Sequence, residues 1–527
     1  MSQIEHLRKI FKTNADRPCL IEAETGRHFT YGELLDRSKR LATALEKRGL
    51  RNGDKILFSA SNSIELAMLY FAAWHVGVEV IPINPLLHEH EFGMLAKMAA
   101  ADLVCVSAEV RAKFDGVWAS LTGANIVCFK ETGSLNPEEE STLADFNVED
   151  EITRNAPCPG LPFGDDTRDD TVFLRIYTSG TTSLPKGIQM TWGGVLGNER
   201  LFGAWHGVTP NSRFYNILPM AYLGGIHNLL MLPLACGGSV VIDRPFGTTN
   251  IFRFWDTVRE LKINTLWFTA AHLAMLLSLR DDEDMGWLRS QIVLGLVGMA
   301  PLAVRIKREF EERFGFMLYE NYALSETTFL TSNRNSLVYK PGSSGPVLPG
   351  VELKIVDDSG ADLRVGHDGT IKVRTPYMMK GYVDAHETDR SSMQDGWFIT
   401  GDIGHLDQDG ELFVTGRAKD LIIRGGLNIS PATVEAALYT HEAVQEAAVV
   451  GIPHDVYGEE IVGVVTLKPG QNASSDGLLA HCAERLANFQ RPRSIHILDE
   501  MPKGVSGKIE KRQIRAKLAI LTDQPRV

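Results

Sequence analysis

The sequence predicts an α/β protein whose sheets are largely parallel over about the first 330 residues. Short β-branched apolar segments such as Lys55–Ser59 alternate there with longer amphipathic stretches such as Tyr31–Arg48. This alternation is typical of helices layered on parallel strands. After about Pro341, short segments divided by Asp-Gly pairs indicate antiparallel hairpins instead. A chain of 527 residues is too long for one ordinary core, so about three folding units are expected.

The individual elements follow from this alternation. Strands are predicted at residues 55–59, 78–83, 103–107, 172–174, 240–242, 265–268 and 317–319. Helices are predicted at residues 31–48, 63–75, 252–261 and 301–314, the last of which ends at Gly315. The interval from about Glu131 to Asp170 is rich in Glu, Asp, Pro and Gly, and it is predicted to be a solvated connector.

The region after residue 341 is expected to contain two smaller parts. Its antiparallel strands are predicted at residues 352–356, 370–373 and 411–414. A compact C-terminal unit begins near Lys419, and its elements are strands at 447–451 and 461–467 and helices at 431–439 and 475–487.

Composition and charge exclude several classes of protein. The net charge is −12 and basic residues are dispersed until the C-terminal end, so nucleic acid is not expected as a partner. The six cysteines show no paired spacing and the N-terminus lacks a signal-peptide core, which favours a reducing cytoplasm. The longest apolar stretches, at 66–83 and 229–242, are interrupted by polar residues, Pro or Gly. No transmembrane segment is therefore expected, and any membrane contact would be peripheral.

The most informative stretch runs from Tyr177 to Gly187, a series of small hydroxyl residues and glycines that ends in Pro-Lys-Gly. It follows an apolar strand, so it is predicted to be a tight loop in which backbone N–H groups and hydroxyls surround phosphate oxygens. Pro185 and Gly187 stand where the common NTPase phosphate loop has Gly and Ser or Thr. The loop therefore indicates a nucleotide that is handled by a different phosphate chemistry, and the structural alternative is a merely flexible loop.

Four further clusters follow along the chain. In Asn321–Glu326, an aromatic ring can stack on a purine and a carboxylate can hold Mg²⁺ that bridges phosphates. In Trp397–Asp402, a carboxylate behind a Gly turn is suited to accept hydrogen bonds from ribose hydroxyls. The segment Gly416–Asp420, followed by Arg424–Gly426, marks a domain junction, and Ser506–Ile509 places one lysine on a small flexible loop.

The order and content of these five motifs resemble the adenylate-forming (AMP-binding) superfamily, which includes acyl-CoA synthetases, firefly luciferase and the adenylation domains of peptide synthetases. The resemblance spans essentially the whole chain. It implies that ATP and a carboxylate give an acyl-adenylate and pyrophosphate, and that a second substrate, usually a thiol, then attacks the acyl-adenylate.

The resemblance also implies a fold. A large multi-subdomain N-terminal domain, made of two α/β layered sheets plus a distorted β-barrel, is expected over residues 1–418. A small mobile α+β C-terminal domain is expected over residues 419–527. The small domain carries the catalytic lysine and rotates between the two half-reactions. The protein is expected to be a monomer or a homodimer.

The nucleotide site is assigned position by position from this resemblance. Its phosphate loop comprises Thr178, Ser179, Gly180, Thr181, Thr182 and Lys186. Tyr322 is expected to stack on adenine, and the residues across the nucleotide or at its edge are Gly298, Met299, Ala300 and Asn321.

The remaining polar residues of the site receive separate roles in the same way. Ser325 is expected beside the phosphate, and Glu326 together with Thr181 beside Mg²⁺. Asp402 is expected to bind the ribose hydroxyls with help from Arg417. The catalytic lysine that bridges the carboxylate and the α-phosphate is Lys508, and the hinge is Lys419. The physical logic agrees, because a carboxylate that attacks a triphosphate brings two anions together, and Mg²⁺ and a lysine ammonium offset their repulsion.

Coenzyme A is favoured as the acceptor of the acyl group. Tyr457 and Phe489 resemble positions that hold the CoA adenine, and Arg491 and Arg493 are placed for its 3′-phosphate. Gly426 would line the pantetheine tunnel, where a side chain would obstruct the thiol arm. Three alternatives remain open: Tyr457 and Phe489 as core residues, transfer to a carrier-protein phosphopantetheine thiol or to an amine, and a non-catalytic relative that binds nucleotide.

The acyl pocket is expected to border Tyr222, Gly224 and Ala323. Relatives that activate amino acids carry an Asp near Tyr222 that is absent here, so an α-amino acid is disfavoured. Ala323 stands where acetate-type enzymes carry a Trp, so an acid larger than acetate can enter. Met299 replaces a usual second glycine, and its bulk should shorten or bend the cavity. A medium-sized acyl or aryl acid, with a role in fatty acid metabolism, is therefore predicted.

Several other positions depart from the family pattern or lie near the pocket. Ser183 replaces a Gly in the phosphate loop and restricts its backbone, which affects rate rather than reaction class. Trp192 stands where a His is common, and Ser325 replaces a Thr but keeps the hydroxyl. His227 and His272 lie near the pocket segments, where a lone His is more often a packed side chain than a ligand contact.

Overall fold

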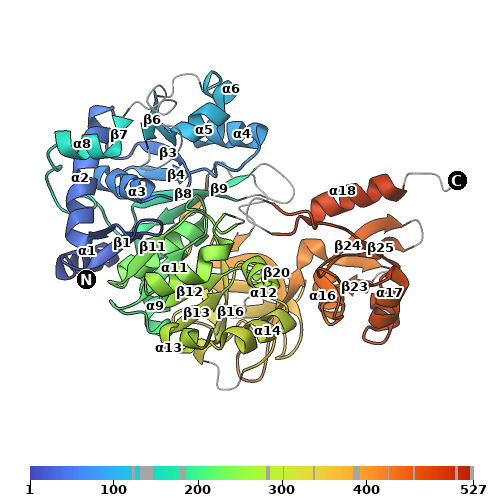
Figure 1. Cartoon of the computed structure of the whole chain (residues 1–527). Coiled ribbons are helices and arrows are strands. Elements are labelled where there is room, and N and C mark those ends of the chain that lie inside the picture. The colour runs from blue at the N-terminus through green and yellow to red at the C-terminus, as the bar shows by residue number, and fades with distance from the viewer. Residues whose placement is uncertain are drawn as a thin grey trace.

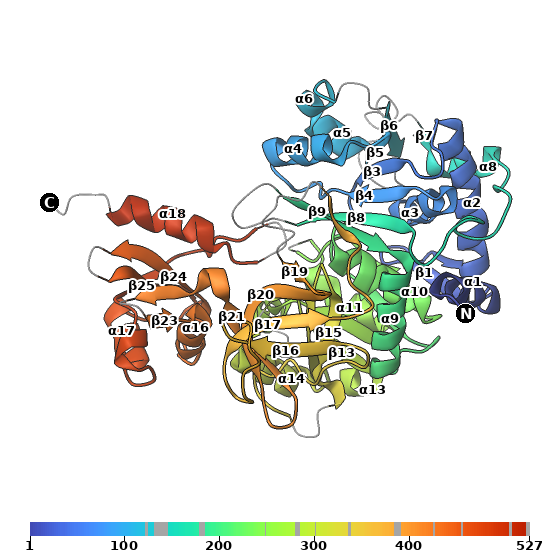
Figure 2. The same ribbon diagram turned by 180° about the vertical axis from the view of Figure 1, so that it is seen from behind.

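Two eight-stranded sheets form the body of the larger domain (Figure 1). The computed structural model describes the chain except for residues 122–124, 131–145, 179–184, 248, 280–284, 301, 336–338, 384–391, 425–426, 455–456, 505–507 and 523–527. A five-stranded antiparallel sheet completes the large domain, and a second five-stranded sheet forms the core of a small C-terminal domain. Both ribbon views show the small domain standing beside the large one (Figure 2).

The first large sheet has the strand order β18-β9-β8-β4-β3-β5-β6-β7. Its strands are β3 (Lys55–Ser59), β4 (Glu79–Pro82), β5 (Leu103–Ser107), β6 (Asn125–Lys130), β7 (Phe146–Asn147), β8 (Val172–Thr178), β9 (Lys186–Thr191) and β18 (Gly381–Val383). The strands from β8 to β7 pair in parallel, whereas β9 and β18 are added antiparallel at one edge.

The second large sheet has the order β15-β14-β13-β12-β10-β11-β1-β2. Its strands are β1 (Pro18–Glu22), β2 (His28–Thr30), β10 (Arg213–Asn216), β11 (Ser239–Ile242), β12 (Thr265–Phe268), β13 (Leu294–Val297), β14 (Leu318–Leu324) and β15 (Thr328–Ser332). Only the edge strands β2 and β15 pair antiparallel. Ligands of α/β proteins bind beyond the carboxyl ends of parallel strands. A ligand site is therefore expected at the segments that follow β12, β13 and β14.

Helices fill the space between the two sheets and cover their outer faces. The central core is shared by α1 (Gln3–Thr13), α2 (Tyr31–Lys47), α3 (Ile64–Val76), α9 (Trp192–His206), the π-helix η1 (Gly224–Met231) and α10 (Leu232–Ala235). The outer helices are α4 (Glu89–Ala99), α5 (Ala108–Lys113) and α6 (Asp115–Trp118) on the first sheet, and α11 (Phe254–Glu260), α12 (Ala270–Ser278), α13 (Leu288–Gln291) and α14 (Val304–Phe314) on the second.

Helix α3 shows how this layering follows from the sequence. Every one of its residues is buried, as expected for a helix that is apolar all round. The Tyr70 hydroxyl donates to the carbonyl of Met220 after β10, and the Trp74 indole N–H donates to the carbonyl of Phe173 in β8. Helix α3 therefore ties the two sheets together.

The two smaller sheets carry the later motifs. The third sheet comprises β16 (Glu352–Val356), β17 (Gly369–Arg374), β20 (Trp397–Leu406), β19 (Met393–Gln394) and β21 (Leu412–Arg417). The sheet of the small domain comprises β22 (Ile422–Arg424), β23 (Leu427–Ile429), β24 (Val444–His454), β25 (Gly458–Leu467) and β26 (Ser494–Ile497). Its helices are α16 (Pro431–Tyr439), α17 (Ser475–Ala483) and α18 (Lys511–Thr522).

The predicted fold class is confirmed, with local corrections. The predicted connector contains α8 (Val148–Arg154), whose Val148 and Ile152 are buried, and Phe163 is 0% exposed. The acidic composition of that interval hid this short amphipathic helix. Gly401 lies inside β20 with φ at +73° rather than in a turn before it, so a local irregularity of the strand positions Asp402. Helix α14 begins at Val304 rather than at residue 301, and it ends at Gly315 as predicted.

Helix α14 also joins the small domain to the large one. The Arg305 guanidinium donates from Nε to the carbonyl of Tyr439 at 3.0 Å and from Nη2 to the carbonyl of Val444 at 3.0 Å. Its Nη1 donates to Glu309 at 2.6 Å, and Lys468 of the small domain lies 3.8 Å from the same carboxylate. These contacts hold the small domain in one orientation.

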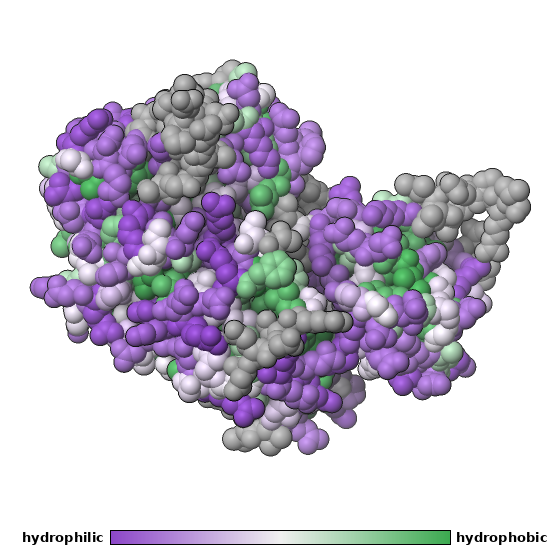
Figure 3. Space-filling model, viewed as in Figure 1, coloured by the Kyte–Doolittle hydropathy of each residue, from purple (hydrophilic) through white to green (hydrophobic). Residues whose placement is uncertain are grey.

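The surface is largely hydrophilic on the face shown in Figure 3, with apolar side chains gathered in limited areas, one of them on the small domain. Among the described helices, none has the length and apolar character needed to cross a bilayer. No disulfide joins any of the six cysteines, all of which lie in the described part of the chain.

Candidate active site

Asp402 lies at the centre of a hydrogen-bonded group that joins two sheets of the large domain. Its side chain is buried, and the Tyr322 hydroxyl donates to its Oδ2 at 2.6 Å. Nε of Arg417 lies 2.9 Å from its Oδ1, because the pairing of β20 with β21 sets Asp402 opposite Arg417. Burial, followed by the nearby Asp402 carboxylate, raises the pKa of Tyr322. Three residues predicted for the adenosine end of a nucleotide are thus in direct contact.

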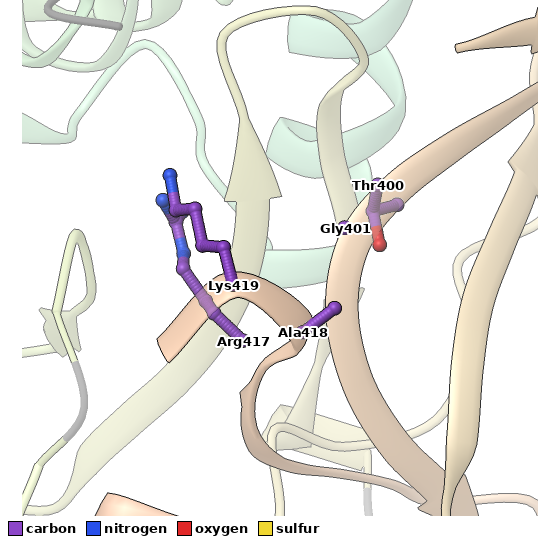
Figure 4. A pocket seen from close by; sticks show the side chains of 5 residues that line it. All are labelled: Thr400, Gly401, Arg417, Ala418 and Lys419. Atoms are coloured by element: carbon purple, nitrogen blue, oxygen red, sulfur yellow. The ribbon is translucent and has the colours of Figure 1, made fainter. Parts of the chain in front are cut away.

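A cavity of about 130 Å³ opens beside this group. It is lined by Thr400, Gly401, Arg417, Ala418 and Lys419. Figure 4 shows that Arg417 and Lys419 extend from their segment in the same direction, while Thr400 and Gly401 belong to the neighbouring strand. Ala418, Lys419 and Asp420 form the 3₁₀ turn η5, into which the predicted domain boundary falls.

Lysines from two segments approach the Asp402–Arg417 pair. The pKa of Lys508 is lowered, first by desolvation and then by Arg417, while Asp402 acts in the opposite direction. The pKa of Lys419 is lowered first by desolvation and then by Arg417, with Lys186 adding to the effect. Both side chains retain solvent exposure, so they lie at the mouth of the site. Arg417 and Asp402 thus both act on the pKa of Lys508, although Lys508 belongs to the small domain.

Glu326 and Lys186 lie on either side of one tyrosine. The Tyr382 hydroxyl donates to Oε1 of Glu326 at 2.8 Å, and Nζ of Lys186 lies 5.3 Å from the centroid of the Tyr382 ring. Tyr382 belongs to β18, which pairs with β9 directly after the phosphate loop. The predicted Mg²⁺ carboxylate and the predicted phosphate-loop lysine are therefore held by a shared aromatic side chain.

Backbone strain accompanies the hairpin that carries Ser325 and Glu326. Thr328 follows this turn with φ at +58°, a left-handed conformation that is a genuine outlier for a β-branched residue. Its hydroxyl donates to the carbonyl of Thr327 at 2.6 Å. Strain of this kind persists where the surroundings over-determine a conformation, commonly at functional sites.

The segment after β13 combines a required glycine with a strained methionine. A Cβ on Gly298 would lie 2.8 Å from Oδ1 of Asn321, whose amide donates to the carbonyl of Val297 at 3.0 Å. Met299 has φ at +73°, in the region that favours glycine. A side chain there costs about 1 kcal/mol or more relative to glycine, so the bulk of Met299 is retained against a local conformational cost. Ala300 continues this segment and is partly buried.

The predicted acyl-pocket residues lie around Met299. A Cβ on Gly224, the first residue of η1, would lie 3.0 Å from Cε of Met299, so the thioether packs against the start of this helix. Burial raises the pKa of Tyr222, and a hydrogen bond with the Asn84 side chain opposes this rise. Ala323 in β14 is exposed, as expected for a residue that borders open space.

The small domain presents an aromatic surface that Arg424 organises. Tyr457 and Phe489 are 46% and 43% exposed, so they are not core residues. The Arg424 guanidinium lies 5.0 Å from the centroid of the Tyr457 ring, and its Nη1 donates to the carbonyl of Phe489 at 3.3 Å. The Arg491 guanidinium donates to the carbonyls of Leu486 and Ala483 at the C-terminal end of α17.

Comparison with known proteins identifies the family. The model of the AMP-binding enzyme family matches residues 7–383, and that of the AMP-binding enzyme C-terminal domain matches residues 433–508. The chain belongs to the AMP-binding enzyme family. The predicted membership of the adenylate-forming superfamily, with the character of an AMP-forming acid–CoA ligase, is thereby confirmed.

Individual relatives of this AMP-binding enzyme are similar over almost their full length. It is 29% identical to 4-coumarate-CoA ligase 1 of Narcissus pseudonarcissus over 96% of its own chain and 91% of the relative. It is 28% identical to a long-chain-fatty-acid–CoA ligase of Bacillus subtilis strain 168 over 93% of its own chain and 90% of the relative. The crystal structure of ATP-bound MatB from Rhodopseudomonas palustris superposes with a TM-score of 0.88 at 26% identity, covering 99% and 100% of the two chains.

Some predicted site residues of this AMP-binding enzyme lie outside the described residues. They are Ser179, Gly180, Thr181, Thr182, Ser183 and Gly426. Thr178 ends β8 opposite Lys186 in the ladder with β9. Arg493 is exposed, and its backbone N–H donates to the carbonyl of Ile461.

Two residues that contact the site were missed by the sequence reasoning. Tyr382 follows a Lys-Gly pair far from the phosphate loop, and only the pairing of β18 with β9 brings it to Glu326. Arg424 was read as part of a junction motif, whereas it contacts both predicted CoA aromatic residues. No local signal in the sequence reveals either contact, since both arise from residues distant in the chain.

Proposed function

We propose that this AMP-binding enzyme activates a carboxylic acid with ATP to an acyl-adenylate, releases pyrophosphate, and transfers the acyl group to the thiol of coenzyme A. The products are acyl-CoA and AMP. The observation that carries this proposal is the contact of Asp402 with both Tyr322 and Arg417 in the large domain, and the lowered pKa of Lys508 in the small domain, to which Arg417 contributes, supports it. A cation delivered there offsets the repulsion between the attacking carboxylate and the α-phosphate.

The large-domain residues receive distinct tasks in this proposal. Asp402, held by Tyr322 and Arg417, accepts hydrogen bonds from the ribose hydroxyls. The Tyr322 ring supports the adenine, and Gly298 leaves room for Asn321 at its edge. Lys186 lies beside Tyr382 at the end of the phosphate loop, where it draws negative charge onto the leaving pyrophosphate.

The Glu326 carboxylate is the group that would hold Mg²⁺, together with Thr181 and phosphate oxygens. Hard cations take carboxylate oxygens, and the Tyr382 hydroxyl fixes the orientation of Glu326. Among the described residues there is no group of three or more side chains that could hold a metal ion by itself. This fits an ion that is bound mainly through the substrate, where it would neutralise phosphate charge.

A panel of carboxylic acids, scored for pyrophosphate release with ATP, tests the proposal. We expect release with medium-sized acyl or aryl acids, and thioester formation when free coenzyme A is added. If a stable acyl product formed only when a carrier protein or an amine was added, and not with free coenzyme A, the alternative acceptors would be favoured. Failure of every acid to drive release would overturn the adenylation proposal itself.

Met299 is proposed to limit the length of the acid. The relatives include CoA ligases named for 4-coumarate, for oxalate and for long-chain fatty acids, so their names do not select one acid. In this chain the thioether fills the space against Gly224. We expect Met299→Gly to shift the preferred straight-chain acid by about two or more methylene groups, because the removed side chain frees that volume.

This shift is measured as kcat/KM for pyrophosphate release along a series of straight-chain acids. Met299→Leu is the matched control, since it keeps the bulk and should keep the wild-type preference. Glycine also relieves the positive φ, so Met299→Gly should remain folded. Equal preference of wild type and Met299→Gly for long chains would contradict the assignment.

A further inference from the structure

A buried carboxyl group lies in the central core behind the predicted acyl pocket. Glu199 is on α9, and its side chain is 0% exposed. Neither of its carboxylate oxygens has a hydrogen-bond partner among the described residues. Burial raises the pKa of Glu199 well above its ordinary value. A buried carboxyl group without a partner costs stability, so its presence in this core calls for a ligand.

His227 on η1 faces the same carboxyl group. Its Nε2 lies 3.9 Å from Oε1 of Glu199 and has no hydrogen-bond partner within the described part of the chain. The other ring nitrogen, Nδ1, lies 2.9 Å from Oδ1 of Asn228. Since an amide oxygen only accepts, Nδ1 carries the proton, and Nε2 of the neutral ring is an acceptor. Burial lowers the pKa of His227 to about 4, which keeps the ring neutral.

The two groups are spaced to hold one oxygen atom between them. At 3.9 Å they are too far apart for a direct hydrogen bond. An oxygen about 2.8 Å from each atom spans that separation, with an angle of about 90° between its two hydrogen bonds. A hydroxyl satisfies both partners, because it accepts from the protonated Glu199 and donates to Nε2 of His227. A methyl group satisfies neither, and a carboxylate offers no proton to His227.

Aromatic packing connects this pair to the predicted acyl pocket. The His227 ring lies 4.8 Å from the ring of Phe329, measured between centroids. Phe329 pairs with Ala323 in the β14–β15 ladder, beside a register shift between Tyr322 and Ala323, and Phe329 is buried whereas Ala323 is exposed. On the other side, the flexible Met299 thioether packs against Gly224, three residues before His227. The pair is therefore linked to two predicted pocket residues, to Ala323 through the strand pairing of Phe329 and to Gly224 along η1.

The helix that carries His227 is itself unusual. Residues Gly224–Met231 form a π-helix of eight residues. Such helices are rare overall, but those that occur often lie at functional sites. A Cβ on Gly225 would lie 2.2 Å from the carbonyl of Pro219, so the helix packs closely on the segment before it. This geometry fixes the direction of His227 relative to Gly224.

We propose that Glu199 and His227 bind a hydroxyl group at the distal end of the acyl substrate, so that the enzyme selects hydroxy acids over apolar acids of equal length. This inference rests on the proposed function and specifies its substrate class. Entry of the substrate requires the Met299 thioether to turn aside. The hydroxyl makes two hydrogen bonds that a methyl-terminated acid leaves unmade, and this difference accounts for its selection.

The test compares matched acids with the wild-type enzyme. Straight-chain acids of about four to ten carbons are each supplied with a terminal methyl, hydroxyl, ammonium or carboxylate group, together with 3-phenylpropanoic acid and its 4-hydroxy form. We expect kcat/KM for pyrophosphate release to favour the hydroxyl form at the best length by about 10-fold or more. A preference for the methyl, ammonium or carboxylate form at every length would overturn the inference and would mean that the pair holds only water.

Two variants at Glu199 separate recognition from folding. Glu199→Leu removes both hydrogen-bonding atoms at similar volume, and the hydroxyl preference should fall to about 2-fold or less. The midpoint temperature of thermal unfolding of Glu199→Leu should be no lower than that of wild type, because the substitution removes an unpartnered buried polar group. Glu199→Gln retains a donor and an acceptor, as the protonated carboxyl does, and should keep the preference. An unchanged hydroxyl preference in Glu199→Leu would show that the pair does not contact the substrate.

A variant at His227 gives a second measurement. His227→Phe keeps an aromatic ring against Phe329 and removes the acceptor, so the hydroxyl preference should fall while turnover of the methyl-terminated acid is maintained. Equal loss of turnover with both acids would indicate a packing role and would overturn the recognition role. Absence of pyrophosphate release with every acid would instead overturn the proposed function, and this inference with it.

Discussion

Replacement of Lys508 by alanine is expected to lower acid-dependent pyrophosphate release by about 10²–10³-fold or more. The pKa of Lys508 responds to Arg417 and Asp402, although Lys508 belongs to the small domain. In the first half-reaction two anionic groups must approach, and a positioned cation stabilises the charge that builds up between them. The second half-reaction, thioester formation from a supplied acyl-adenylate, does not require this cation and should be retained.

The measurement is the rate of each half-reaction with purified Lys508→Ala enzyme. Lys503→Ala is the matched control, because Lys503 lies on the same segment but pairs with Glu446 of the small domain at 2.7 Å. It should retain wild-type pyrophosphate release. If Lys508→Ala and Lys503→Ala lost pyrophosphate release to the same extent, the loss would reflect a general effect on this segment, and the specific role of Lys508 would be refuted.

The parts of the fold that the sequence predicted well are those with a strong local signal. The strands at 265–268 and 352–356 and the helix at 431–439 have the predicted bounds, since apolar β-branched runs or a helical pattern identify them without tertiary information. The connector was predicted wrongly because the Glu-rich start of α8 resembles solvated chain, and only its Val148 and Ile152 reveal a buried face.

The candidate site was predicted as separate motifs, whereas its geometry depends on contacts between distant segments. Nothing near Asp402 in the sequence indicates that Tyr322 donates to it, and nothing near Glu326 indicates Tyr382. The strain at Met299 was likewise beyond the sequence, which showed only that a usual glycine is missing. Resemblance to a family supplied the roles, and the pairing of β20 with β21 and of β9 with β18 supplies the contacts.

The orientation of the small domain follows from the same kind of long-range contact. Arg305 binds two backbone carbonyls of the small domain, and in the same orientation the pKa of Lys508 responds to Arg417 and Asp402. One orientation therefore accounts for both observations. In the proposed function the thiol acceptor must reach the acyl carbon after adenylation, so we expect the small domain to leave this position and the Arg305 contacts to break.

Lys419→Pro is expected to retain pyrophosphate release and to lower thioester formation by about 100-fold or more, because the acceptor groups would no longer be brought into place. Lys419 lies in the 3₁₀ turn η5 between β21 and the small domain. Proline fixes φ near −65°, which agrees with a 3₁₀ turn but forbids other values. The variant should therefore hold the orientation seen here, in which Arg305 binds the carbonyls of Tyr439 and Val444.

The two half-reactions of Lys419→Pro are measured separately, with pyrophosphate release for the first and conversion of a supplied acyl-adenylate with coenzyme A for the second. Lys419→Ala removes the same charge without restricting φ, so it should retain both steps and serves as the matched control. A similar loss of thioester formation in Lys419→Ala would assign the effect to the ammonium group. Equal loss of both half-reactions in Lys419→Pro would refute the hinge role, since a fixed turn in this orientation leaves the adenylation geometry intact.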